Sequence, residues 1–362
     1  MTLANGDFTS GSFQLSAEDI FFDARLGIAL PKGIRSFYTR LSPTGRFDLD
    51  FGNIKISTAD DGEKYIDFAG AVKFKDCNFK TSPAVTELDA LFKANGLYRI
   101  GDGFCGARIE FTADSLKIKD KSLTNLKANI NYDPGRRCWM TDDLIADCYD
   151  GRLTGRLELK QPASGASEYL LETGFDNIDL KRFLSDTKPE EISHNGPTSG
   201  RMNGSLSVSG YFSDTYSRIG RCRLSISDMQ VGKLSPFAKL LYVLKLTEPK
   251  DFAFEQMLVD SYIRHNKLFL EKFDLSGQAV AFNGSGWINL QSQNVDLTLT
   301  ARGRRLAAAE PSILQSLTEG LGQAVVKMEV TGSVYDPQVK TETLPVIKET
   351  LGILGTKPSV PQ

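Results

Sequence analysis

Strict alternation of apolar and polar residues is the feature that most limits how this 362-residue chain can fold. The clearest example is VDLTLT, in which Val295, Leu297 and Leu299 are each followed by a polar residue. Successive side chains of a β-strand point to opposite faces of a sheet, so this pattern predicts strands with one apolar and one polar face. Similar short runs, separated by turns, fill residues 260–303.

Glycine placed before or within an alternating run is a second recurring pattern. Residues 151–157 (GRLTGRL) match residues 204–210 (GSLSVSG), and related forms lie at 284–290 and 330–334. Glycine inside a strand pattern marks a turn or a tight bend. The copies are irregularly spaced, which argues against a strict solenoid or a propeller. We therefore expect a mainly β protein built as a long meander of antiparallel strands.

A few short amphipathic helices are expected between the strands. The strongest candidate, residues 236–246, follows Ser235 and has an apolar stripe with the spacing i, i+3, i+4 and i+7. This stripe consists of Phe237, Leu240, Leu241 and Leu244. We expect this helix to cover the apolar face of the sheet. Shorter helices are expected at 31–41, at 179–184 and after Ser82-Pro83, where apolar residues recur at spacings of three and four.

Composition excludes several classes of function. A net charge of −2 argues against a nucleic-acid partner, which would require a basic face. No G-x-S-x-G, P-loop or H-E-x-x-H motif occurs, so we expect no enzymatic activity, no cofactor and no metal. No run of eighteen apolar residues is present, so the sequence predicts no membrane-spanning helix.

The five cysteines do not form a metal-ligand pattern. They are Cys77, Cys105, Cys138, Cys148 and Cys222. None belongs to a C-x-x-C pair or has histidine at zinc-ligand spacing. Buried thiols are one interpretation, and a Cys138–Cys148 disulfide in an oxidising compartment is the other.

The order of five segments resembles the C-terminal region of the AsmA-like family. A glycine-led strand (GRMNGSLSVSG) comes first, then an apolar helix after Lys-Leu-Ser-Pro, and finally the closing motif VTGSVYDPQV. The matching segments are 200–210, 220–246, 254–270, 282–299 and 330–339. Residues 166–355 are thus expected to form an AsmA-like C-terminal region. Residues 1–165 are expected to form the N-terminal part of the same sheet, with a weaker resemblance, and residues 356–362 a disordered tail.

The resemblance implies a long, curved antiparallel sheet that forms a half-open apolar groove. It further implies a place in the periplasm or cell envelope of a diderm bacterium and an N-terminal anchor in the inner membrane. Because the sequence lacks this anchor, we expect either that it lies upstream of Met1 or that the protein works as a soluble form. The implied role is to hold or transfer phospholipid between the inner and outer membranes, or to support outer-membrane assembly. The residues expected to line the groove are Leu206, Val208, Leu224, Ile226, Leu268, Leu270, Leu275, Ile288, Leu290, Val295, Leu297 and Leu299.

Two alternatives remain open at this stage. Two sheets packed as a closed sandwich would show the same alternation, and would leave no apolar face for a ligand. A structural or carbohydrate-binding β protein without a lipid ligand would also fit the strand pattern. A carbohydrate site would require exposed aromatic platforms, to which Trp139 and Trp287 contribute little.

Overall fold

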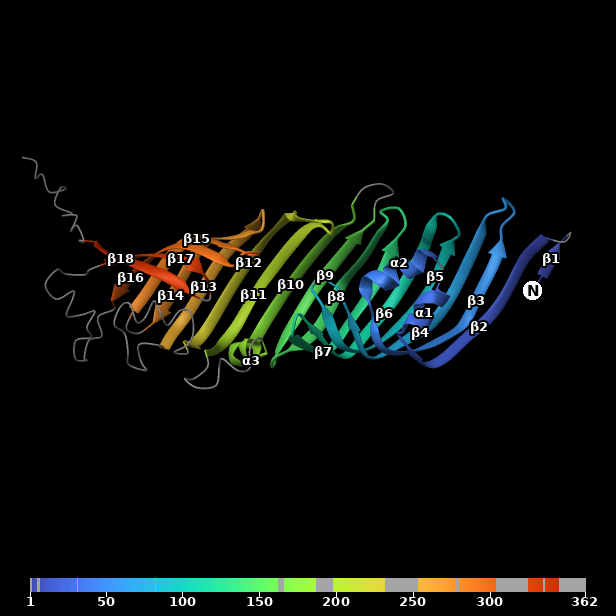
Figure 1. The fold of residues 1–362 in the computed structure, drawn as a ribbon, viewed down its shortest axis with the longest axis horizontal. Helices are drawn as coiled ribbons and strands as arrows, with labels where there is room; N and C mark the ends of the chain where they lie inside the picture. The colour runs from blue at the N-terminus through green and yellow to red at the C-terminus, as the bar shows by residue number, and fades with distance from the viewer. Residues whose placement is uncertain are drawn as a thin grey trace, which may run out of the picture.

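The protein is one long antiparallel sheet, as the alternation predicts (Figure 1). The computed structural model describes residues 2–4, 7–30, 32–81, 83–161, 166–186, 198–231, 253–277, 280–303, 325–334 and 336–344. Within these residues, each of the 18 strands pairs antiparallel with the next strand along the chain. Figure 1 shows the strands side by side along the long axis of the molecule, with the N-terminus near one end.

The strands are long, which gives the sheet its width. The first nine are β1 (Thr2–Ala4), β2 (Asp7–Phe21), β3 (Thr44–Thr58), β4 (Lys64–Phe79), β5 (Val85–Arg99), β6 (Gly103–Ile118), β7 (Lys121–Asp133), β8 (Cys138–Cys148) and β9 (Gly151–Lys160). The remaining nine are β10 (Glu168–Asp179), β11 (Ser199–Tyr211), β12 (Asp214–Gln230), β13 (Ala253–Arg264), β14 (Lys267–Gly277), β15 (Val280–Asn289), β16 (Asn294–Gly303), β17 (Val325–Ser333) and β18 (Pro337–Leu344). Pairing of β9 with β10 carries the sheet across the expected boundary at residue 165.

In the described part of the chain, three short helices follow strands at one edge of the sheet. Helices α1 (Ala24–Ala29) and α2 (Lys32–Leu41) join β2 to β3, and α3 (Leu180–Ser185) follows β10. The helices expected at 31–41 and 179–184 are thereby confirmed. The expected helix at 236–246, with Phe237, Leu240, Leu241 and Leu244, lies outside the described residues, as does the tail at 356–362.

The helix expected after Ser82-Pro83 is wrong, because this segment forms strand β5. Its apolar residues Val85 and Leu88 are three apart, as in a helix. The spacing arises from an irregularity in the sheet: the register shifts between Thr86 and Asp89, and Glu87 has a φ of 50°. An extra residue in a strand moves the next apolar side chain from i+2 to i+3, and so imitates helical spacing.

Strand register gives the sheet one apolar and one charged face. Residues directly opposite each other in neighbouring strands share a face. In the centre of the sheet Leu157 pairs with Leu171, and Leu171 pairs with Val208. One residue along, Arg156 pairs with Glu172 on the opposite face. We call these the apolar face and the charged face.

A row of β-bulges crosses the sheet near the edge that carries the helices. The bulged residues have positive φ angles and lie where the register shifts; among them are Asp19, Asp76, Glu87, Asn125 and Asn177. Each extra residue restores the alternation, so that apolar residues on either side of the bulge stay on one face. Phe175 and Ile178, for example, both contribute to the apolar core although they are three residues apart.

Side chains from neighbouring strands satisfy the backbone N–H groups that these bulges leave unpaired. The amide of Asp19 donates to Asp48 Oδ1 (2.9 Å), and that of Asp76 donates to Asp89 Oδ1 (2.9 Å). The amide of Asn177 donates in the same way to the side-chain oxygen of Asn203 (2.7 Å). These hydrogen bonds replace the ladder partners that the bulged residues lack, so the side chains stabilise the bulged conformation.

Glycine is required where strands β15 and β16 approach most closely. Gly286 has a φ of 150°, and a Cβ atom there would lie 2.2 Å from the carbonyl oxygen of Asp296 and 2.7 Å from Leu297 Cα. Both are backbone atoms, which cannot move aside without disturbing the ladder.

We therefore expect Gly286→Ala to lower the free energy of unfolding by about 1–3 kcal/mol, the usual cost of overpacking a core. The matched control is Gly106→Ala in β6, where a Cβ atom would meet nothing within 4 Å. Chemical denaturation of both variants is the measurement. Equal stability of the two variants would contradict the close contact between Gly286 and the backbone of β16.

Candidate functional site: the apolar face

The predicted groove residues of the strands all lie on one face of the sheet. In the ladder between β11 and β12, Leu206 is opposite Cys222, and Leu224 is opposite Gly204. Further along, Leu268 pairs with Ile288, and Ile288 pairs with Val295. The register also places Val208, Ile226, Leu270, Leu275, Leu297 and Leu299 on this face. Leu290 follows β15 in the turn to β16, and is 40% exposed.

Burial divides these residues into two groups. Five are enclosed by protein: Ile226, Leu270, Leu275, Val295 and Leu299. Around them, Phe282 and Met328 are only 1% and 0% exposed, so this part of the sheet has a closed core. Six are half-buried: Leu206, Val208, Leu224, Leu268, Ile288 and Leu297. The half-buried group is the part of the predicted set that a ligand could reach.

The middle of the sheet adds half-buried residues that the sequence analysis did not single out. Leu157 and Leu171 lie beside Val208, and Ile109 lies opposite Ile130 between β6 and β7. All of them are half-buried. The signal was present in the alternation of residues 151–157, but the family resemblance is weaker in this part of the chain. The accessible apolar surface is thus centred further towards the N-terminus than expected.

Two rows of aromatic rings line the apolar face in the N-terminal half. Nearer the helix edge, Phe47, Phe74, Phe92 and Phe111 follow one another at centroid distances of 6.4, 5.2 and 4.4 Å. At the opposite edge, Phe104, Tyr132 and Trp139 form a cluster, joined by Tyr98. Stacked and edge-to-face rings stabilise a sheet beyond their buried area. The rings therefore hold both margins of the face in a fixed shape.

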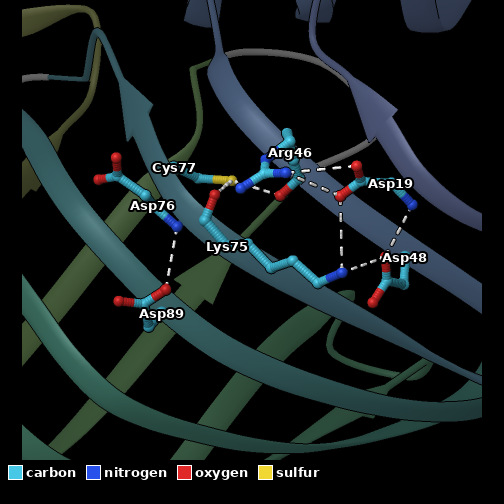
Figure 2. Close-up of polar contacts among 7 residues, drawn as sticks. All are labelled: Asp19, Arg46, Asp48, Lys75, Asp76, Cys77 and Asp89. Carbon is cyan, nitrogen blue, oxygen red and sulfur yellow. Dashed lines mark hydrogen bonds and ion pairs between the residues drawn. The ribbon is translucent and has the colours of Figure 1, made fainter.

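The charged face carries networks of ion pairs near the bulges. Lys75 Nζ lies 2.7 Å from Asp48 Oδ1 and 3.7 Å from Asp19 Oδ1, and Arg46 also binds Asp19 at 3.2 Å. Figure 2 shows how these four side chains lie. The Asp19 backbone N–H and the Lys75 ammonium both hold the pKa of Asp48 below its ordinary value. This network is largely exposed, and such pairs contribute little stability each. Their main effect is to make this face unsuitable for an apolar ligand.

A shallow hollow of about 570 Å³ lies on the charged face over strands β9 to β12. Residues with small side chains, such as Gly174, Ser205 and Ser207, form part of its lining together with Arg156 and Arg221. Arg156 binds Glu172 at 3.4 Å, and Arg221 binds Asp260 and Glu271 outside the hollow. The arginines thus have carboxylate partners from the protein itself.

A polar cluster at the helix edge fixes α3 to the sheet. The Tyr149 hydroxyl donates to Asp186 and accepts a hydrogen bond from the Ser122 backbone N–H (2.8 Å). Lys121 Nζ lies 4.2 Å from the ring centroid of Phe183 in α3. Burial, reinforced by the hydrogen bond to Asp186, raises the pKa of Tyr149 to about 12.

A Cys138–Cys148 disulfide is excluded, which corrects one of the two interpretations of the cysteines. The two residues are at opposite ends of the same strand, β8. Ten steps along a strand span roughly 33 Å, whereas a disulfide requires Cα atoms within about 7 Å. All five thiols are free, and burial raises the pKa of Cys148 to about 11. Buried and half-buried thiols are therefore the correct interpretation.

Comparisons with models of protein families, with curated proteins and with solved structures find no match to this chain. The resemblance to the AsmA-like family therefore rests on the sequence motifs. Within the described residues, no helix is long and apolar enough to cross a membrane. In the same part of the chain, no group of three or more histidine, cysteine or acidic side chains is arranged to hold a metal ion.

The raised pKa of Tyr149 predicts an alkaline limit to stability. Because the folded state favours the neutral phenol, the contribution of Tyr149 is fully present below pH 10, its ordinary pKa, and is lost as the pH rises towards 12. We expect Tyr149→Phe to be less stable than wild type by about 1 kcal/mol at neutral pH, the net value of a hydrogen bond. This difference should shrink above pH 10.

The measurement is chemical denaturation across this alkaline range. Tyr216→Phe is the matched control, because Tyr216 is 60% exposed and far from α3 in the sequence. A constant difference between wild type and Tyr149→Phe over the whole range would refute this assignment.

Proposed function

We propose that the chain is a non-enzymatic cell-envelope protein that binds the acyl chains of phospholipid along the apolar face of its sheet. It would hold or transfer phospholipid between the inner and outer membranes, or support outer-membrane assembly. The observation that carries the proposal is the row of half-buried apolar side chains in the middle of the sheet, which spans β9 to β11 between Thr141 of β8 and Gly220 of β12. Its centre is formed by Leu157, Leu171 and Val208, which are opposite one another in β9, β10 and β11.

The free energy of apolar hydration favours a lipid ligand on this row. A sheet with one apolar face must cover that face with protein or with another apolar molecule. The residues around Phe282 are covered, but those around Leu171 are half-buried. An acyl chain lying there would gain about 0.8 kcal/mol for each buried methylene group. Aliphatic side chains in a row match the shape of such a chain without requiring a specific polar contact.

The charged face of the sheet also supports the binding of acyl chains on the apolar face alone. Strand β9 has Leu153, Leu157 and Leu159 on the apolar face, and Arg152, Arg156 and Lys160 on the charged face. This separation would keep acyl chains on one side of the sheet. The ladder of paired strands continues beyond β9 in both directions, so the row could guide a lipid along the molecule rather than enclose it in one pocket.

The cellular context follows from the family resemblance. It suggests the periplasm of a diderm bacterium as the location, phospholipid or another acyl-chain lipid as the ligand, and a membrane as the partner.

A structural or carbohydrate-binding protein is the alternative. A carbohydrate site would need aromatic rings that are free to contact a sugar, whereas the tryptophan rings here contact other side chains. The aliphatic row therefore supports the lipid hypothesis more strongly than the rings support this alternative. Trp139 lies against Phe104 and Tyr132, and Trp287 lies under Lys267 Nζ at 3.9 Å on the charged face. The experiment below separates the two functions.

Two adjacent leucines of β10 provide a matched test. Leu171 lies on the apolar face, and Leu170 lies on the charged face between Glu158 and Ser209. We expect Leu171→Lys to weaken binding of a fluorescent phospholipid at least about tenfold, because an ammonium group would lie among the acyl chains. Leu170→Lys should bind like wild type. Binding is measured by fluorescence titration, with a thermal melting curve for each variant.

Both variants should remain folded, since half-buried lysine can extend its ammonium group to water. The lipid hypothesis fails if wild type binds no phospholipid, or if both variants bind as well as wild type. Binding of an oligosaccharide, with no binding of lipid, would favour the alternative.

A further inference from the structure

The segment that joins β2 to β3 is strongly basic in a chain that is otherwise close to neutral. Residues 22–43, which lie between these two strands, contain four cationic residues and one acidic residue, Asp23, although the whole chain has a net charge of −2. The cations are Arg25, Lys32, Arg35 and Arg40. The same segment forms α1 and α2, which we call the basic hairpin.

The basic hairpin is a built element with a defined shape. The Arg35 guanidinium donates to the carbonyl oxygens of Ile28 and Leu30, and thereby ties the start of α2 to the end of α1. The Tyr38 hydroxyl of α2 donates to the carbonyl oxygen of Asp23 (2.8 Å). The neighbouring Phe22 stacks on Phe47 of the sheet with a centroid distance of 4.5 Å. The hairpin is therefore held against the N-terminal end of the sheet.

This element presents apolar side chains to water beside its charges. Ile28 in α1 is 71% exposed, more than any other large hydrophobic residue in the described part of the chain. Arg25 and Arg35 are exposed as well, and Phe21, immediately before the hairpin, is 59% exposed on the charged face, opposite Arg46. On the adjoining strand β2, Phe13 and Leu15 are 49% and 44% exposed on the apolar face.

We propose that the basic hairpin docks on the surface of an anionic lipid bilayer. Short amphipathic helices with basic and exposed apolar side chains bind membranes by inserting the apolar groups at the headgroup boundary, while the cations contact anionic lipid. The excess of four cationic residues over one acidic residue in positions 22–43 gives the charge complementarity that this requires.

Docking through the hairpin goes beyond acyl-chain binding by the sheet and does not depend on it. Docking would nevertheless orient the apolar face relative to the bilayer, because the hairpin and the exposed residues Phe13 and Leu15 lie at the same end of the molecule. Lipid would then enter or leave at the N-terminal end of the sheet.

The test is flotation of the full chain with vesicles of phosphatidylglycerol and phosphatidylcholine, and with vesicles of phosphatidylcholine alone. Wild type should bind the anionic vesicles, and binding should weaken with added salt because the charges are screened. Arg25→Glu should bind about tenfold more weakly, since each cation near an anionic surface contributes substantially to binding. Ile28→Ser should also weaken binding about tenfold, through the loss of one inserted apolar side chain.

Matched controls separate the hairpin from general surface effects. Lys127→Glu changes an exposed cation in β7, and Ile219→Ser changes an isoleucine in β12 that is 56% exposed. Both should float like wild type, and all four variants should melt like wild type because the altered side chains are exposed. The proposal is overturned if wild type ignores anionic vesicles, if the hairpin variants bind as wild type does, or if the controls lose binding equally.

Failure of the docking proposal is distinguishable from failure of the proposed function. Ile28→Ser should retain binding of the monomeric fluorescent phospholipid, because Ile28 lies outside the apolar row. Leu171→Lys should retain flotation with anionic vesicles. If Ile28→Ser lost both activities, the hairpin would belong to the lipid site itself and independent docking would be wrong.

Discussion

Pairing of every strand with its successor is the constraint on which the rest of the structure depends. In an antiparallel pair, residues that face each other share a side of the sheet, so one correct register between two strands fixes the face of every residue in both. Repeated over the 18 strands, this rule aligns leucines as distant in sequence as Leu157 and Leu268 on one face. A slip of one residue in any pair would place arginines such as Arg156 among them.

The β-bulges allow such long strands to keep this order. A strand of fifteen residues seldom alternates without error, and an unpaired backbone amide appears wherever the alternation is corrected. Here asparagine and aspartate solve both problems. They tolerate the positive φ angle of the bulge, as at Asp76 and Asn177, and they accept the free N–H from the neighbouring strand, as Asp89 and Asn203 do. The bulges also explain why Val85 and Leu88 imitate a helix.

The two faces and the hairpin divide the surface into regions with different chemistry. The row around Leu171 is apolar and half-buried, the charged face carries ion pairs, and the basic hairpin combines cations with an exposed isoleucine. A phospholipid has an apolar and a charged part, and a molecule that handles it needs surfaces of both kinds. The proposed function and the proposed docking site thus address different parts of the same ligand class through residues that can be changed separately.

The sequence by itself determined the mainly β class, the antiparallel meander and the face on which residues such as Val295 and Leu297 lie, because period-two alternation is a local property. It also predicted α2 and α3, whose apolar spacing and flanking residues are local too. Only the tertiary structure decided how far each apolar side chain is covered. Leu299 and Leu206 have the same pattern in sequence, yet Leu299 is buried in a closed core and Leu206 is half-buried. Burial depends on which other strands and loops approach a residue, and the alternation within one strand contains no information about them. For the same reason the free thiols of Cys138 and Cys148 could be assigned only when β8 was seen to separate them.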